Sequence, residues 1–327
     1  MIKWRLILYP FSVLYDGITR VRNWAFDKGL LVSKSYDIPV ISVGNLSTGG
    51  TGKTPMVEYL IDLLANKRVA VLSRGYGRKT RGFKYVGTDS LPKEVGDEPA
   101  QIKQKFGNSI ISAVCESRVE GIDRIISQNT VDVIILDDAY QHRYVKASDY
   151  ILLTSYGKLY GDDFVLPAGN LRESRKGASR AACIVVTKCP VNLTDQNRLE
   201  IKKKLRVLPE QKLFFSYIDY QQNVLSEGEL LPLKSLDNQT IAAVAGIAKP
   251  ALFFKHLKEN LKNVVTYTYQ DHFDYNHSTL QNWSEDVIIT TEKDYVKLKK
   301  FKQLNLFYLP IKNKFLGNKL ELNDLNI

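Results

Sequence analysis

Val40-Ile-Ser-Val-Gly-Asn-Leu-Ser-Thr-Gly-Gly-Thr-Gly-Lys-Thr-Pro-Met-Val-Glu-Tyr-Leu-Ile61 is the stretch that decides the fold class of this chain. A β-branched run over residues 40–43 leads into a glycine-rich turn, and a helical pattern opens at Pro55. Strand, glycine-rich loop and helix in this order form a P-loop, whose backbone N–H groups and helix N-terminus bind phosphate oxygens. The alternative is an ordinary turn that happens to precede a lysine, but the flanking strand and helix favour the P-loop. The stretch therefore predicts a nucleoside triphosphate site.

The polar groups of this loop have expected roles. Lys53 would reach the β- and γ-phosphates, and the Thr54 hydroxyl would ligate Mg²⁺. Ser47 is a departure from the usual pattern, which has glycine five residues before Gly52. The residues expected to bind the nucleotide are Ser47, Thr48, Gly49, Gly50, Thr51, Gly52, Lys53 and Thr54.

A second nucleotide-site pattern is Val133-Ile-Ile-Leu-Asp137-Asp138, a hydrophobic strand that ends in two carboxylates. A nucleotide site needs a carboxylate there to hold Mg²⁺, directly or through water. Aspartates at strand ends are common, so the position behind a P-loop is what favours the metal role. We expect Thr54, Asp137 and Asp138 to form the metal site, with the direct aspartate ligand left open. His142, shortly after, either contacts the nucleotide or packs.

Composition places the chain among globular proteins. It has 327 residues, of which 44% are hydrophobic and 25% charged, so wholesale disorder is excluded. Lys and Arg number 46 against 35 Asp and Glu, an excess of 46 − 35 = 11. Such an excess fits nucleic acid, an anionic membrane surface or a phosphorylated substrate, and charge alone does not choose among them. The three cysteines lack metal-ligand spacing and are expected to be buried thiols.

The N-terminal segment, residues 1–28, predicts an amphipathic helix. Apolar side chains recur at helical spacing, with basic side chains around them; the apolar positions are Trp4, Leu8, Phe11, Tyr15 and Ile18. The uncharged run over residues 6–15 is ten residues long, too short for a bilayer crossing, which needs ~20. Such a helix can lie in an anionic membrane surface or pack on the core of its own domain. The basic excess favours the membrane surface.

Apolar runs alternate with helical patterns along the rest of the chain. The runs read as strands cover residues 68–73, 109–114, 130–136, 150–154, 182–187, 240–246, 286–290 and 306–309. This alternation predicts an α/β fold: a P-loop NTPase-type, mainly parallel sheet with helices on both faces, plus a smaller C-terminal α/β domain joined by a β-ribbon or linker. The expected boundaries are a membrane-surface helix at 1–28, a P-loop core at 29–212, a linker or ribbon at 213–237 and the smaller domain at 238–327, closing a substrate cleft.

Phosphoryl transfer to an alcohol needs positioned charge and a base for the hydroxyl proton. Gly96-Asp97-Glu98-Pro99 places two carboxylates at a helix start, although Asp97 could simply cap that helix. His272 lies in a polar loop over residues 269–275 and could equally be a satisfied loop histidine. The segment Leu166-Pro-Ala-Gly-Asn-Leu-Arg172-Glu-Ser-Arg175 is basic and suits anionic oxygens.

Seven motifs occur together and in order. They are Gly44-Asn-Leu-Ser-Thr-Gly-Gly-Thr-Gly-Lys-Thr-Pro55, Leu72-Ser-Arg-Gly-Tyr-Gly-Arg78, Gly96-Asp-Glu-Pro99, Asp137-Asp-Ala-Tyr-Gln-His142, Gly169-Asn-Leu-Arg-Glu173, Asp271-His-Phe273 and Thr291-Glu-Lys-Asp294. As a set they resemble the tetraacyldisaccharide 4′-kinase family, the lipid A 4′-kinases of Gram-negative bacteria, from the N-terminal helix to about residue 311. Ser47 is what that family carries, whereas Ala139-Tyr140 replaces its more typical Gly-Phe.

The resemblance implies a reaction and a location. The family transfers the γ-phosphate of ATP to the 4′-hydroxyl of the lipid A disaccharide 1-phosphate at the cytoplasmic face of the inner membrane, so a peripheral membrane kinase is expected. ATP and Mg²⁺ are the implied cofactors. By position, Asp97 would be the general base, His272 would pair with it and tune it, and Arg172 would neutralise phosphate charge. With Lys53, these residues form the expected catalytic set.

A regulatory P-loop ATPase or GTPase is the alternative function. Thr187-Lys-Cys-Pro190 partly matches the element that reads guanine, but Pro190 stands where the guanine-binding carboxylate is needed, which favours ATP. Because no nucleic-acid module is recognised, we expect no nucleic-acid partner. We expect a monomer that contacts the lipid substrate and the membrane surface.

Overall fold

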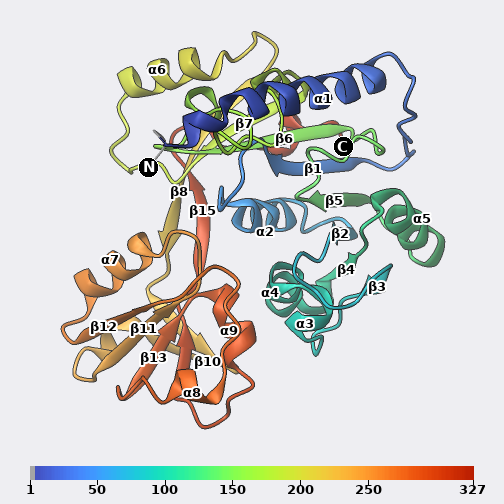
Figure 1. Cartoon of the computed structure of the whole chain (residues 1–327). Helices are drawn as coiled ribbons and strands as arrows, with labels where there is room; N and C mark the ends of the chain where they lie inside the picture. Colours follow the sequence, from blue (N-terminus) through green and yellow to red (C-terminus); the bar gives the residue numbers. More distant parts are fainter. Residues whose placement is uncertain (1–3) are drawn as a thin grey trace. The chain divides into compact units, whose positions relative to one another are not determined.

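The computed structural model describes residues 4–327, which divide into two compact units (Figure 1). The first unit comprises the residues up to Arg74, Ser109–Ile218 and Asn313–Ile327, and the second comprises Gly75–Asn108 and Asp219–Lys312. Residues 1–3 of the predicted N-terminal helix, and the side chain of Trp4, lie outside what is described.

The first unit contains most of a large sheet whose strands lie in the order β15-β8-β7-β6-β1-β5-β2-β4-β3, the edge strand β3, Lys84–Tyr85, coming from the second unit. Their bounds are β1 Val40–Asn45, β2 Val69–Ser73, β4 Ile110–Val114, β5 Val133–Asp137, β6 Asp149–Ser155, β7 Cys183–Thr187, β8 Lys212–Tyr220 and β15 Ile311–Phe315. From β8 to β4 every neighbouring pair is parallel, which confirms the predicted mainly parallel sheet.

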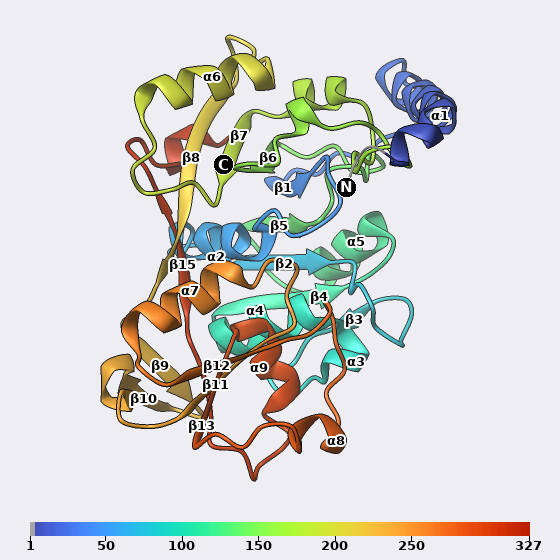
Figure 2. The ribbon, with the colours of Figure 1, turned by 60° about the vertical axis from the view of Figure 1, so that its left-hand side comes forward.

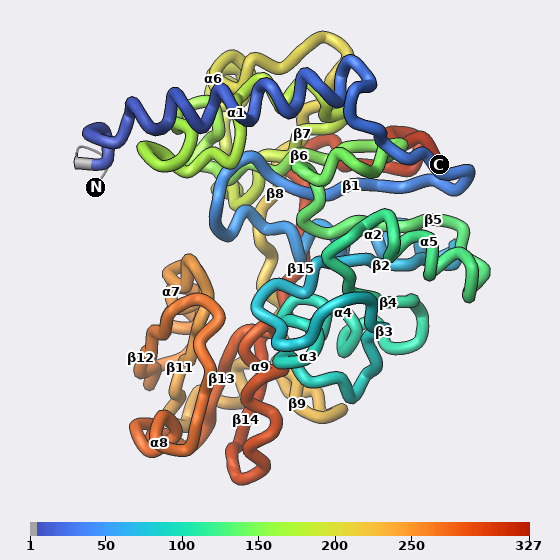
Figure 3. Tube along the Cα trace, turned by 45° about the vertical axis from the view of Figure 1, so that its right-hand side comes forward, coloured from blue at the N-terminus to red at the C-terminus, as the bar shows by residue number. Residues whose placement is uncertain are grey.

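The central strands are buried along their whole length, as their apolar sequences require. All residues of β1, β2, β5 and β7 are buried, so both faces of the sheet are covered. The helices of this unit are α1 Tyr9–Asp27, α2 Lys53–Leu63, α5 Arg118–Gln128 and α6 Asp195–Leu205. The serine and threonine before α5 and α6, Ser117 and Thr194, cap their helices by accepting from backbone N–H groups. The chain through α1 runs as one long continuous coil (Figure 3).

The second unit is built on a smaller mixed sheet in the order β10-β9-β14-β13-β11-β12. Its strands are β9 Asn223–Ser226, β10 Glu229–Pro232, β11 Ile241–Ala245, β12 Val264–Thr268, β13 Val287–Thr290 and β14 Leu306–Tyr308. The strands from β14 to β12 are parallel, whereas β9 and β10 form an antiparallel hairpin. The other elements are β3 Lys84–Tyr85, α3 Pro92–Val95, α4 Asp97–Phe106, α7 Ala251–Asn260, α8 His277–Leu280 and α9 Glu292–Leu298 (Figure 2).

Alternation along β11 builds a core on each face of this smaller sheet. Ala243 and Ala245 face a cluster that includes Phe253 and Leu257 of α7. Ala242 and Val244 face the opposite cluster, which includes Leu298 of α9 and Tyr275. Because successive strand residues point to opposite faces, α7 and α9 are held on opposite sides of the sheet.

The units group residues differently from the expected boundaries in two places. Gly75–Asn108, which carries Asp97, groups with the C-terminal strands, and Asn313–Ile327 groups with the P-loop unit. The segment expected as a linker contributes β8 to the large sheet and β9 and β10 to the small one. The boundaries drawn from sequence remain a prediction about which segments fold independently.

The N-terminal helix is present. A short 3₁₀ turn over Trp4–Leu8 precedes α1. Among the helices over residues 4–327, none has the length and apolar character that crossing a bilayer requires.

Candidate active site

The P-loop lies between the end of β1 at Asn45 and the start of α2 at Lys53. The helix therefore begins two residues before Pro55, where the sequence pattern placed it. Gly49 has a φ of +102° and Gly52 a φ of +85°, a region that glycine adopts without steric cost. These two residues let the loop turn back over the N-terminus of α2.

The backbone of the P-loop is held by side chains from neighbouring strands. Asn45 Nδ2 donates to Thr51 Oγ1 over 2.8 Å, and Thr187 Oγ1 donates to the Thr51 carbonyl over 2.7 Å. Lys188 Nζ donates to the Gly50 carbonyl over 2.8 Å. The Thr187-Lys188 pair, considered above as a base-reading element, thus contacts the phosphate loop itself.

Two cations converge on one carboxylate beside this loop. Lys53 Nζ lies 3.7 Å from Asp138 Oδ2, and Arg172 Nη1 lies 2.9 Å from Asp138 Oδ1. Burial alone would raise the pKa of Asp138, but Lys53 and Arg172 more than offset burial and hold that pKa below its ordinary value. Asp138 has a φ of +46°, an uncommon conformation for a residue with a side chain. The arrangement is an ionised carboxylate between two cations, suited to exchanging partners with phosphate oxygens.

The neighbouring carboxylate, Asp137, ends β5 and is buried. Ser73 Oγ donates to Asp137 Oδ2 over 3.2 Å, and Arg118 Nη2 donates to the Asp137 carbonyl over 3.2 Å. Arg118 is only 2% exposed, and its burial lowers the pKa of the guanidinium to about 10. Neither partner was predicted, because a serine at the end of one strand and an arginine at a helix start give no sign in sequence of a contact with Asp137.

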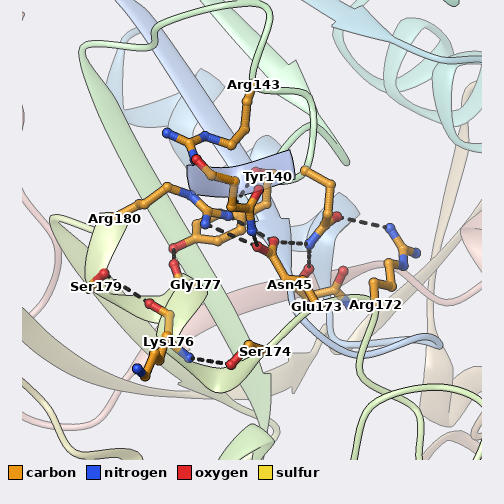
Figure 4. Close-up of polar contacts among 12 residues, drawn as sticks. Asn45, Tyr140, Arg143, Arg172, Glu173, Ser174, Lys176, Gly177, Ser179 and Arg180 are labelled. Atoms are coloured by element: carbon orange, nitrogen blue, oxygen red, sulfur yellow. Dashed lines mark hydrogen bonds and ion pairs between the residues drawn. The ribbon is translucent and has the colours of Figure 1, made fainter. Parts of the chain in front are cut away.

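A hydrogen-bonded network positions Arg172 (Figure 4). Glu173 is 3% exposed and binds Arg180 through two contacts of 2.8 and 3.0 Å. Gln141 Nε2 donates to Glu173 Oε1 over 3.1 Å and to the Asn45 carbonyl over 2.8 Å, and its Oε1 lies 3.5 Å from Arg172 Nη1. The network therefore joins the end of β1 to the arginine that contacts Asp138.

Tyr140 and His142 flank Gln141 and pack rather than reach the loop. The ring of Tyr140 is buried and its hydroxyl donates to the Gly177 carbonyl over 2.7 Å, which accounts for a tyrosine where the family more typically has phenylalanine. His142 packs against Tyr144 with a ring separation of 5.8 Å. Burial, aided by nearby arginines, lowers the pKa of His142 to about 4, so the ring is neutral.

The second unit brings the other two predicted catalytic residues together. Asp97 Oδ2 lies 3.0 Å from His272 Nδ1. Asp97 is the first residue of α4, whose N-cap is Gly96, and no side chain caps the helix. The capping interpretation of Asp97 is therefore not what the structure has. His272 has a φ of +63°, a conformation that histidine rarely adopts and that its surroundings must hold in place.

The charged groups around this pair offset the effect of burial on the pKa of Asp97. Burial would raise the pKa of Asp97, but the hydrogen bond from His272 and the ammonium groups of Lys297 and Lys293 hold it below its ordinary value. The hydrogen bond to Asp97 raises the pKa of His272 against its burial. Lys297 Nζ lies 3.4 Å from Asp97 Oδ2 and 3.1 Å from Asp294 Oδ1. Asp97 is thus an ionised carboxylate with an oriented histidine beside it.

The residues predicted to hold Mg²⁺ carry oxygen donors, and their assignment as ligands stays a prediction. In the described part of the chain, no group of three or more histidine, cysteine or carboxylate side chains forms a metal cage. Mg²⁺ usually takes one or two carboxylates together with phosphates and waters, so it needs no such cage. Thr54 in the first turn of α2 and Asp137 and Asp138 after β5 are hard oxygen donors of the right kind.

Comparison with known proteins finds relatives that match nearly the whole chain. The family model described as tetraacyldisaccharide-1-P 4′-kinase matches residues 4–325. A tetraacyldisaccharide 4′-kinase of Flavobacterium johnsoniae is 51% identical over 319 residues, covering 96% of this chain and 94% of that protein. One of Bacteroides thetaiotaomicron is 41% identical over 344 residues, covering 97% of this chain and 90% of its own.

A solved structure matches the whole architecture. The crystal structure of the "apo" form of LpxK from Aquifex aeolicus in complex with ATP is similar with a TM-score of 0.78 and 34% identity, covering 95% of both chains. These similarities confirm the resemblance and the fold class predicted from sequence.

Proposed function

This chain belongs to the tetraacyldisaccharide-1-P 4′-kinase family, and from that premise we propose how its residues divide the work of phosphorylating a lipid A precursor. The acceptor is the 4′-hydroxyl of the tetraacyldisaccharide 1-phosphate, and the donor is ATP. The hydroxyl oxygen forms a bond to the γ-phosphorus, the bond from that phosphorus to the leaving ADP oxygen breaks, and the hydroxyl proton passes to a base.

The P-loop side chains bind the transferred group in this proposal. Backbone N–H groups of residues 47–52 and the N-terminus of α2 receive the phosphates. Lys53 and Arg172, which meet at Asp138, turn toward phosphate oxygens and balance their charge. Thr54, Asp137 and Asp138 would hold Mg²⁺, which would neutralise charge on the phosphates.

Asp97 is the proposed general base. It is buried and ionised, it does not cap its helix, and it holds a hydrogen bond to His272. That combination is the single observation that carries the assignment, because a general base must be ionised and oriented, and Asp97 is both. His272 orients the carboxylate and keeps one of its oxygens occupied, leaving the other for the proton of the hydroxyl.

Substitution of Asp97 tests the assignment. The Asp97→Asn protein should bind ATP but form little doubly phosphorylated lipid from labelled ATP, Mg²⁺ and the lipid disaccharide. Glu94→Gln is the matched control, because Glu94 lies in the same unit and pairs with Lys84 at the surface over 2.8 Å. Normal product formation by Asp97→Asn would place the base elsewhere.

We further propose that α1 lies in the surface of the cytoplasmic leaflet, which makes the enzyme a peripheral membrane protein. One stripe of the helix and the turn before it is apolar and at least 61% exposed; it consists of Ile7, Phe11, Leu14, Ile18 and Val21. The spacing of four and three residues puts these side chains on one face.

The opposite face of α1 contacts the protein; it is polar except for Phe26, which is buried at the end of the helix. The backbone N–H of Ala168 donates to Ser12 Oγ over 2.9 Å, and Asn23 Nδ2 donates to Glu173 Oε2 over 2.7 Å. A helix that packed on its own core would bury the apolar face instead. The reversed arrangement supports the membrane surface over core packing.

A further inference from the structure

Lys293 in α9 faces the ring nitrogen of His272 that points away from Asp97. Lys293 Nζ lies 3.2 Å from His272 Nε2. It also lies 2.9 Å from Glu98 Oε1 and 2.9 Å from Asp271 Oδ1, and its side chain is 14% exposed. Two carboxylates therefore fix the ammonium group against the histidine.

The donors and acceptors available on Lys293 and His272 limit which protonation state of the ring fits this contact. A lysine ammonium carries three donors and no acceptor, so it can bond to His272 Nε2 only if that nitrogen carries a lone pair. A neutral imidazole has one donor and one acceptor, which places the proton on Nδ1. Nδ1 faces Asp97 Oδ2 at 3.0 Å, and an ionised carboxylate only accepts. The contact with Asp97 needs a proton on Nδ1, and the contact with Lys293 needs a lone pair on Nε2. Only the neutral tautomer with its proton on Nδ1 satisfies both contacts.

We propose that Lys293 is a positioning residue that opposes the charged form of His272 and fixes the proton of the neutral ring on Nδ1 beside Asp97. An imidazolium in the same place would set an N–H on Nε2 against the ammonium group at 3.2 Å. The catalytic consequence rests on the proposed role of Asp97 as base. A neutral ring orients the carboxylate, whereas a full positive charge 3.0 Å away would make it a weaker base.

Some of the groups that face His272 favour its charged form and others oppose it. Glu98 Oε1 and Asp271 Oδ1 lie 3.8 and 3.9 Å from Nε2, and with Asp97 they favour the charged ring. The ammonium group of Lys293 opposes the charged ring at close range. Lys297 contacts Asp97 rather than the ring, and the Tyr76 ring packs against His272 with a centroid separation of 5.3 Å. Removing the Lys293 charge would leave three carboxylates around the ring, and the ring would take up a proton.

An NMR titration of the full-length protein tests this directly. The chain has only four histidines, so the His272 resonances can be assigned by their loss in His272→Gln. Long-range ¹H–¹⁵N correlations at alkaline pH should show the proton of wild-type His272 on Nδ1. In Lys293→Met the His272 titration midpoint should rise by about one pH unit or more.

Three further variants separate charge from folding. Lys293→Gln keeps a donor without the charge and should show the same upward shift, which serves if Lys293→Met does not fold. Lys293→Arg keeps the charge and should restore the wild-type midpoint. Lys299→Met removes a lysine that instead bonds to Gln104 over 2.8 Å and should leave the midpoint unchanged. An unchanged midpoint in both neutral variants, or a wild-type proton on Nε2, would overturn the proposal.

Kinetics then distinguish this inference from the proposed base. The acid limb of the kcat/KM profile should move to higher pH in Lys293→Gln by the same amount as the His272 midpoint, with activity recovered on the alkaline side. A shifted midpoint together with a fully active Asp97→Asn protein would retain the role of Lys293 and reject Asp97 as base. An inactive Asp97→Asn protein, together with an unshifted His272 midpoint in the Lys293 variants, would retain Asp97 as base and reject the role of Lys293.

Discussion

His272 Nδ1 lies 3.0 Å from Asp97 Oδ2 although 175 positions separate the two residues. Helices α4 and α9 pack together in the second unit, and α9 supplies the lysines on either side of the pair. A carboxylate at a helix start is thereby given a partner that its local sequence does not contain.

The pair should act as one unit in catalysis. Asp97→Asn should reduce kcat by about 10² to 10⁴, because it removes the base without changing its shape. His272→Ala should cost less, and the double variant should lose less than the product of the two single losses, since the residues are coupled. Steady-state kinetics on the four proteins checks this, and strictly multiplicative losses would show that the two residues act independently.

Lys53 should be needed for turnover and dispensable for folding. Its side chain contributes charge near Asp138 and is not part of a hydrophobic core, so Lys53→Ala should abolish phosphoryl transfer with an unchanged thermal unfolding curve. Lys67→Ala, at an exposed position of the same unit, is the control and should retain activity. Wild-type turnover by a folded Lys53→Ala protein would contradict the assignment of the P-loop as the phosphate-binding site.

The exposed stripe of α1 should control membrane binding. Replacing Phe11, Leu14 and Ile18 with serine removes apolar area from the exposed face only, so co-sedimentation with phosphatidylglycerol-containing vesicles should fall while the fold is kept. Leu199→Ser removes an exposed leucine from α6 and should bind vesicles as the wild type does. Undiminished sedimentation of the triple variant would mean that another surface contacts the membrane.

Acid should weaken the fold partly through Asp97. Its folded-state pKa is lowered, so its contribution to stability is fully present above the unfolded value of about 3.9 and is lost as pH falls through the lower folded value. The gap in urea midpoint between the wild type and Asp97→Asn should therefore narrow as the pH is taken from neutral toward 3 and below. A gap that stays constant over that range would show that folding does not lower the pKa of Asp97.

Local sequence patterns were enough to predict the P-loop part of the site and most of the strands. The motif around Lys53 and the carboxylates after β5 are contiguous in sequence, and fully buried parallel strands leave unbroken apolar runs. Strand β12, Val264–Thr268, was missed because it is only partly buried and lacks such a run. The start of α2 was placed two residues late because proline is readily accepted in a first turn.

The partners of these residues could not be predicted in the same way. Arg118 and Ser73 meet Asp137 only because β2, β5 and α5 come together, and nothing in their own neighbourhoods indicates it. Sequence alone leaves Asp97 open as a helix cap or a base; the structure shows Gly96 at the N-cap and His272 beside Asp97. Lys293 was part of a quoted motif, but its role depends on contacts with two segments distant in sequence.

The most direct test of the central claim is product analysis with ATP labelled on the γ-phosphate. The purified protein is incubated with Mg²⁺ and tetraacyldisaccharide 1-phosphate, and the label is traced by mass and by position on the sugar. We predict that the label appears on the lipid at the 4′ position in the wild type and that Asp97→Asn incorporates far less of it in the same time. Release of labelled inorganic phosphate without labelled lipid would contradict the assignment and indicate a regulatory ATPase.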